Sequence, residues 1–157
     1  MRYIELTKDK FAIVDDADFE WLSQWKWYAH ASYRKYYAAR RDKNGQFIYM
    51  HRLITDAPNN LQIDHKNGNG LDNSRSNLRI CTRSQNQANK IQTNQKSSIY
   101  KGVTWYKNYS KWMAQIHFQG KRKFIGYFST EMEAAKAYDL KAKELFGEFA
   151  KLNMPKT

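Results

Sequence analysis

The residues best suited to chemistry lie between positions 64 and 86. Asp64 and His65 follow an apolar residue directly, and a loop rich in glycine and asparagine comes after them. Neutral histidine, with an unperturbed pKa near about 6.5, suits the role of a general base. Carboxylate and amide oxygens suit Mg²⁺ or Mn²⁺, and a carboxyl and an amide alone would be unusual for zinc. Phosphodiester hydrolysis needs both kinds of group, because water must lose a proton and the negative charge on phosphorus must be offset.

Short segments must bring these residues together. The apolar alternation in 61–63 predicts a strand, and the glycines and asparagines of 67–70 allow the chain to bend after it. The segment 76–80 predicts the returning strand, and 85–90 predicts a helix. An Asp-His pair in such a loop is by itself commonly only a turn. The whole pattern, from Asp-His through Gly-Asn-Gly and Asn-Leu-Arg to an Asn-rich helix, is what indicates a site.

This pattern resembles the HNH nuclease motif, in which two strands and a helix hold one divalent metal ion against a phosphate of DNA. The resemblance implies that His65 is the general base and that Asp64 and Asn86 are metal ligands. Asn77 would span the loop by hydrogen bonds and orient His65. Many members of the family have histidine where this chain has Asn86, and the asparagine form also occurs in phage-type members. Asn89 is the nearest competitor for this ligand position.

Residues 1–60 predict a small β-rich unit whose aromatic side chains form its core. Four segments favour strands: 3–6, 11–14, 25–29 and 35–41. Asn44-Gly45 is the signal of a two-residue hairpin turn. His51 stands in a short helical turn before the site, and we expect it to be structural and not catalytic.

The net charge of the chain is +12 at pH 7, which favours a polyanionic partner, above all double-stranded DNA. The single cysteine, Cys81, excludes an intramolecular disulfide and a four-cysteine zinc site. The charged N-terminus does not resemble a signal peptide, and no apolar run has membrane-spanning length. We therefore expect a cytoplasmic protein of a bacterial or phage-infected cell. It would act without a membrane or an obligate protein partner, as a monomer or weak dimer.

The pattern changes after position 98. Three strands are expected over 100–106, 111–118 and 121–128, and a helix with a capping box over 130–146. Alternation in the second strand predicts that the helix covers one sheet face and leaves the other open.

This region, about 98–155, resembles the plant ethylene-response-factor (AP2-type) DNA-binding domain. The shared residues are Lys-Gly-Val, Lys-Trp-x-Ala-x-Ile, Phe-Ile-Gly-Tyr-Phe and Glu-Ala-Ala-x-Ala-Tyr-Asp. The resemblance implies that the open sheet face enters the major groove. Its cations at matching positions are only Lys101 and Arg122, so base specificity cannot be carried over. The residues expected to contact DNA are Lys101, Thr104, Tyr106, Met113, Gln115, His117, Arg122 and Phe124. Arg79, in the nuclease part, would be a phosphate clamp or a surface cation.

The sequence thus predicts an α+β protein. A β-rich part and a ββα-metal nuclease core would occupy 1–92, a linker 93–98, and a three-stranded sheet packed on one helix 99–157. The predicted function is that of a homing-type HNH DNA endonuclease that uses Mg²⁺ or Mn²⁺ and nicks duplex DNA. The alternatives are a non-catalytic DNA-binding transcriptional regulator and, from charge and aromatic content only, an RNA-binding protein.

Overall fold

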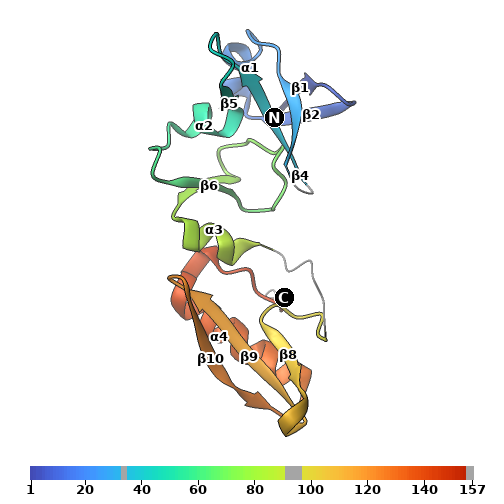
Figure 1. Ribbon diagram of the computed structural model, residues 1–157. Coiled ribbons are helices and arrows are strands. Elements are labelled where there is room, and N and C mark those ends of the chain that lie inside the picture. The colour runs from blue at the N-terminus through green and yellow to red at the C-terminus, as the bar shows by residue number, and fades with distance from the viewer. Residues whose placement is uncertain (33–34, 91–96, 155–157) are drawn as a thin grey trace. The chain divides into compact units, whose positions relative to one another are not determined.

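The computed structural model describes residues 1–32, 35–90 and 97–154, and the chain divides into two compact units, 1–82 and 83–157. Each unit contains small antiparallel sheets and helices (Figure 1). The expected α+β class is therefore confirmed. In the described part of the chain, none of the helices is long and apolar enough to cross a membrane.

The first unit consists of three small sheets and two short helices. Its elements are β1 (Arg2–Leu6), β2 (Lys10–Val14), α1 (Asp16–Leu22), β3 (Tyr28–Ser32), β4 (Lys35–Arg41), β5 (Phe47–Tyr49), α2 (Met50–Thr55), β6 (Gln62–His65) and β7 (Leu78–Cys81). β1 pairs with β2, β4 lies between β3 and β5, and β6 pairs with β7. One core joins the three sheets, because side chains from each of them are buried in the same cluster. It includes Leu6, Val14, Ala38, Met50, Ile63 and Leu78.

The turn between β4 and β5 is longer than the Asn44-Gly45 pair predicts. It runs from Asp42 to Gln46, and the carboxylate of Asp42 accepts hydrogen bonds from the backbone N–H groups of Asn44 and Gln46, both at 2.8 Å. The two-residue turn is therefore wrong. Asp42 N also donates to Gln46 O at 3.0 Å, so the hairpin closes around residues 43–45, and the Asp42 carboxylate satisfies N–H groups within this turn.

The second unit contains α3 (Arg83–Asn89), β8 (Val103–Tyr106), β9 (Lys111–Phe118), β10 (Lys121–Phe128) and α4 (Glu131–Phe146). Two 3₁₀ turns, η1 (Lys107–Tyr109) and η2 (Gly147–Phe149), complete it. β9 is the central strand of the sheet, and α4 lies across one face (Figure 1). The expected capping box is present, with the Thr130 hydroxyl accepting from Glu133 N and the Glu133 carboxylate accepting from Thr130 N.

The core of the second unit lies between α4 and the sheet. Ala114 and Ile116 of β9 are buried against the small residues of α4, as the alternation predicted. α3 also packs into this core, because Ala88 lies in one cluster with Ile116 and Tyr138. We had expected α3 to belong to the nuclease part. The expected linker falls largely on 91–96, outside the described residues.

Candidate active site

Asp64 and His65 end strand β6 and are both buried, with 4% and 6% of their surface exposed. Arg79 lies opposite Asp64 in β7, and its Nε and Nη2 donate to the same carboxylate oxygen, Oδ2, at 2.8 and 2.7 Å. This pair fixes the orientation of the carboxylate. Arg79 had been expected at a phosphate or on the surface, but its side chain is only 11% exposed.

The imidazole of His65 lies among other rings. Tyr37 of β4 is 5.8 Å from it between ring centroids, and His51 of α2 is 5.2 Å away with the two planes nearly perpendicular. Burial lowers the pKa of His65 to about 4, although a hydrogen bond with the Asn73 side chain and the nearby carboxylates of Asp64 and Asp72 oppose the shift. His65 is therefore neutral at physiological pH, which is the state a general base requires.

His51, which the sequence suggested as a structural residue only, lies directly beside the imidazole of His65. Burial lowers its pKa to about 3, and the His65 ring contributes to the same shift. Its ring stacks on Tyr49 at 5.5 Å and meets the edge of Tyr37 at 5.8 Å. Two neutral imidazoles are thus enclosed together, from segments that are 14 positions apart in the chain.

Asn77 bridges the two ends of the loop that follows His65. Its side-chain oxygen accepts from Asn67 N at 3.0 Å, and its side-chain nitrogen donates to Asp72 O at 2.8 Å. Its backbone oxygen accepts from Lys66 N at 3.0 Å. These bonds hold the loop against the start of β7, so Asn77 sets the path of the chain that leaves the imidazole.

The loop is also attached to the N-terminal strands. Ile13 of β2 donates from its N to Leu71 O at 2.9 Å and accepts from Asn73 N at 2.8 Å. Asn73 is fully buried and its side chain donates to Leu71 O, so it belongs to the site as well as to the loop. An asparagine after an aspartate is common in turns, so the sequence did not indicate that Asn73 would be buried at the site.

An ion pair between an exposed arginine and a buried aspartate adds a second attachment. Arg75 donates from Nε and Nη2 to the two carboxylate oxygens of Asp18 in α1, at 2.8 and 2.7 Å. The N–H of Arg75 donates to the carboxylate of Asp15 at 2.8 Å. The Arg75 guanidinium holds the pKa of Asp18 below its usual range. The N-terminal part is therefore an integral support of the candidate site.

The metal ligands implied by the family resemblance are Asp64 and Asn86. Asn86 lies on α3 in the second unit, as does its competitor Asn89. Among the described residues, no group of three or more His, Cys, Asp or Glu side chains has the geometry to hold a metal ion. A single carboxylate with an amide fits a Mg²⁺ or Mn²⁺ site that is completed by water and substrate phosphate, because these hard ions keep several such oxygen ligands.

The open face of the second unit's sheet carries seven of the predicted DNA contacts. Thr104 is the cross-strand partner of Met113, Gln115 that of Phe124, and His117 that of Arg122. Directly paired residues share a face. The seven are Thr104, Tyr106, Met113, Gln115, His117, Arg122 and Phe124.

Tyr109 and Tyr127 join this face without having been predicted. Tyr106, Tyr109 and Tyr127 lie 5.0 to 5.3 Å from one another, and Phe124 is 4.9 Å from Tyr127. An irregularity between Phe124 and Gly126 shifts the register of β10 and brings Tyr127 opposite Met113. Strict alternation could not place Tyr127, because a bulge inserts one extra residue.

Lys101 was also predicted to contact DNA, but its ammonium group is bonded to backbone carbonyls within the protein. Its Nζ donates to the carbonyl oxygens of Ala88 and Lys90, at the C-terminal end of α3. Burial lowers its pKa to about 8, with a smaller contribution from Lys151. A cation at a helix C-terminus satisfies carbonyls that lack partners within the helix and offsets the helix dipole. Lys101 thus fixes α3 within the second unit.

The comparison with known proteins agrees with the geometry of the β6–β7 segment. Residues 49–88 match the family model described as HNH endonuclease. The chain is 33% identical over 147 residues to an uncharacterized HNH endonuclease of Acanthamoeba polyphaga mimivirus, and the match covers 93% of this chain and 76% of that protein. The chain therefore belongs to the HNH endonuclease family.

The C-terminal region has relatives of a different kind. It is 43% identical over 63 residues to the dehydration-responsive element-binding protein 2D of Arabidopsis thaliana, a match that covers 39% of this chain and 30% of that protein. It is 41% identical over 58 residues to the AP2-like ethylene-responsive transcription factor TOE2 of the same plant, which covers 37% of this chain and 12% of that protein. The expected AP2-type resemblance is confirmed.

Proposed function

We propose that this chain is a divalent-metal-dependent DNA endonuclease of the homing type. It would hydrolyse one phosphodiester bond of duplex DNA and leave a nick. The observation that carries the proposal is the pairing of Asp64 with His65 at the end of β6. The carboxylate is oriented there by Arg79, and the imidazole is neutral at physiological pH. Membership of the HNH endonuclease family supports this assignment.

The protein's own residues have separate tasks. Neutral His65 accepts a proton from the attacking water as the new P–O bond forms. Asn77 keeps the loop closed around that imidazole through its bonds to Asn67 and Asp72. Tyr37 and His51 pack against the imidazole, and this burial holds its pKa low and keeps it unprotonated before the reaction.

Asp64 and Asn86 would hold the ion, Mg²⁺ or Mn²⁺. When bound, the ion offsets the charge that develops on the phosphoryl oxygens and on the leaving 3′ oxygen. One such site for each chain supports a nick, because a double-strand break would need a second chain or a second event.

The second unit would hold the DNA. Its open sheet face presents amide, hydroxyl, imidazole and guanidinium groups, and a three-stranded sheet fits the major groove. The similarity to plant factors that are named for DNA-element binding supports the duplex as the substrate.

Replacement of His65 by alanine tests the proposal most directly. We expect Mg²⁺-dependent nicking of supercoiled plasmid by the wild-type chain and a loss of about 100-fold or more in His65→Ala, since a general base contributes roughly that much. DNA binding by this variant should stay unchanged in a gel-shift assay. His30→Ala, which removes an imidazole from the same unit outside the contacts of His65, should keep its nicking activity.

A regulator that only binds DNA is the rival function, and the plant relatives favour it to the extent that they are named as transcription factors. Purified wild-type chain that shifts duplex DNA but never cuts it with Mg²⁺ or Mn²⁺ would establish the regulator. Stronger competition by structured RNA than by duplex DNA would favour the RNA-binding alternative.

A further inference from the structure

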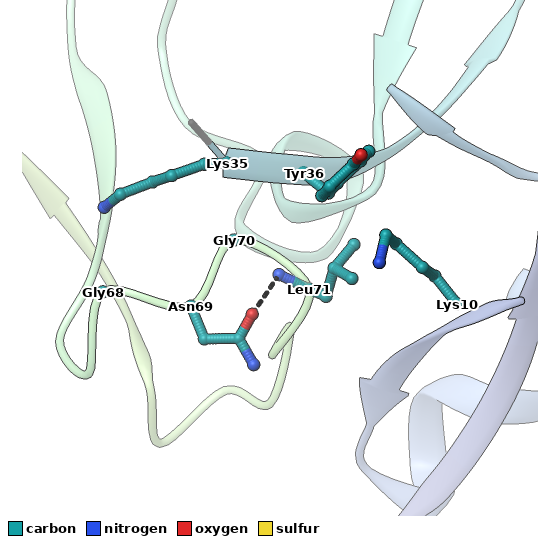
Figure 2. Close-up of a pocket in the computed structure, with 7 residues that line it drawn as sticks. All are labelled: Lys10, Lys35, Tyr36, Gly68, Asn69, Gly70 and Leu71. Atoms are coloured by element: carbon teal, nitrogen blue, oxygen red, sulfur yellow. Dashed lines mark hydrogen bonds between the residues drawn. The ribbon is translucent and has the colours of Figure 1, made fainter. Parts of the chain in front are cut away.

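A small cleft lies in the first unit beside the candidate active site. Its volume is about 330 Å³, and three segments line it: Lys10 of β2, Lys35 and Tyr36 of β4, and the loop residues 68–71. Figure 2 shows Lys10 and Lys35 on opposite sides of the cleft, with Tyr36 between them and the loop along its base. The loop is held in shape by Asn69, whose side-chain oxygen accepts from Leu71 N at 3.1 Å.

The cleft is strongly cationic. The ammonium group of Lys10 lies 4.4 Å from the centroid of the Tyr36 ring, and that of Lys8 lies 5.7 Å from the same centroid. Lys35 adds a third positive charge. Among the residues that the structure describes, no carboxylate lies within ion-pair distance of Lys8, Lys10 or Lys35. Two lysines at the Tyr36 ring and a third lining the same cleft make this surface suited to an anion.

The cleft and the catalytic imidazole share Lys35. Its Nζ lies only 3.8 Å from the point where a Cβ on Gly68 would stand, and Gly68 N donates to His65 O at 2.8 Å. An anion in the cleft would therefore bind within the electrostatic reach of the group that activates water.

We propose that this cleft binds a backbone phosphate of the DNA strand that is cut, next to the phosphate that His65 attacks. The inference rests on the proposed nuclease function, which supplies a polyanion at this place. Lysine ammonium groups on long stems are suited to a phosphate, because each acts as a mobile point charge. The face of the Tyr36 ring holds the ammonium group of Lys10 in the cleft. The contact would fix the register of the strand at the active site.

The test uses the full chain, a duplex isolated by selection for binding to it, and no divalent metal, so that binding is measured without cleavage. Each phosphate in turn is replaced by an uncharged methylphosphonate. For the wild-type chain, we expect that the methylphosphonate at one position of the duplex lowers the binding affinity about tenfold, a loss typical of a charged hydrogen bond. In the double variant Lys10→Gln, Lys35→Gln, affinity should fall by a similar factor, and this methylphosphonate should have no further effect.

Two controls accompany the test. Lys26→Gln removes an exposed lysine of the same unit that does not line the cleft, and it should keep the methylphosphonate effect. The double variant Lys10→Arg, Lys35→Arg should keep it too. Thermal unfolding of all variants establishes that they are folded.

The outcomes separate the subsite from the nuclease function. If the double glutamine variant and wild type lose affinity equally at every methylphosphonate, the cleft holds no DNA phosphate and the inference is overturned. Saturable binding of inorganic phosphate that needs Lys10 and Lys35, without any methylphosphonate effect, would mean a free phosphate site and would overturn it as well. A chain that shows the expected interference but never nicks plasmid would refute the nuclease function and leave the subsite standing.

Discussion

The two histidines that meet near the end of β6 show how burial prepares a side chain for chemistry. His65 was predicted from its neighbours in the sequence, but its contact with His51 depends on the packing of α2 against the site. No spacing rule connects two residues from different elements, so His51 was expected to be structural only. Its ring now forms part of the enclosure that keeps His65 neutral.

The burial of His51 and His65 should make the free energy of unfolding depend on pH. The pKa of His51 is lowered from 6.5 to about 3 and that of His65 to about 4. Below about pH 6.5 the two histidines are therefore protonated in the unfolded chain but remain neutral in the folded chain. Stability is therefore complete above pH 6.5 and falls as the pH decreases toward these values, by at most about 5 kcal/mol for His51 and about 3 kcal/mol for His65.

His51→Gln, which cannot be protonated, should lose much less stability than wild type between pH 7.5 and about pH 5. Urea unfolding of the metal-free protein at the two pH values measures the difference. An equal loss in both proteins would show that His51 is not responsible.

At the level of elements, most strands of both units could be predicted from alternation and turn residues, and so could α4 from its capping box. The strand expected over 25–29 is displaced and forms β3 at Tyr28–Ser32. The support of the site loop could not be predicted. Its hydrogen bonds run from Leu71 and Asn73 to Ile13, and its ion pair runs from Arg75 to Asp18. Such attachments between distant segments depend on tertiary packing, and the sequence gives no local sign of them.

Gly70 is where this loop comes closest to β4. A Cβ on Gly70 would stand 2.5 Å from Tyr36 O and 2.6 Å from the Tyr37 ring, so any side chain must displace backbone. Gly70→Ala should destabilise the protein by about 3 kcal/mol, as overpacking does, and should reduce nicking. Gly45→Ala is the matched control. It has open space around it and a φ of +78°, so it should cost only about 1 kcal/mol and leave nicking intact. Denaturant unfolding and plasmid assays distinguish the two.

At the level of the whole molecule, the net charge of +12 predicts binding to DNA that weakens steeply with salt. The architecture decides which cations contribute. Arg122 lies on the open sheet face, whereas the ammonium group of Lys101 is bonded to the carbonyls at the end of α3. The sequence placed both on the same face, because a strand pattern does not show where a long flexible side chain turns.

The two cations should therefore behave differently. Arg122→Gln should reduce the slope of log affinity against log salt by about 0.9, the value for one phosphate. Lys101→Gln should leave this slope unchanged and lower the free energy of unfolding by about 2 kcal/mol, because it removes charged hydrogen bonds. Fluorescence anisotropy at several salt concentrations, with chemical denaturation alongside, measures both quantities. A reduced slope for Lys101→Gln would assign this lysine to the DNA.

The attachment of Ile13 to Leu71 and Asn73 limits how this nuclease can be shortened or recombined. A fragment trimmed to the matched family segment, 49–88, would retain the pair Asp64 and His65 but lose the strand to which their loop is attached. Engineers who wish to graft the cutting activity onto a foreign targeting protein should therefore transplant the chain from its first strand onward.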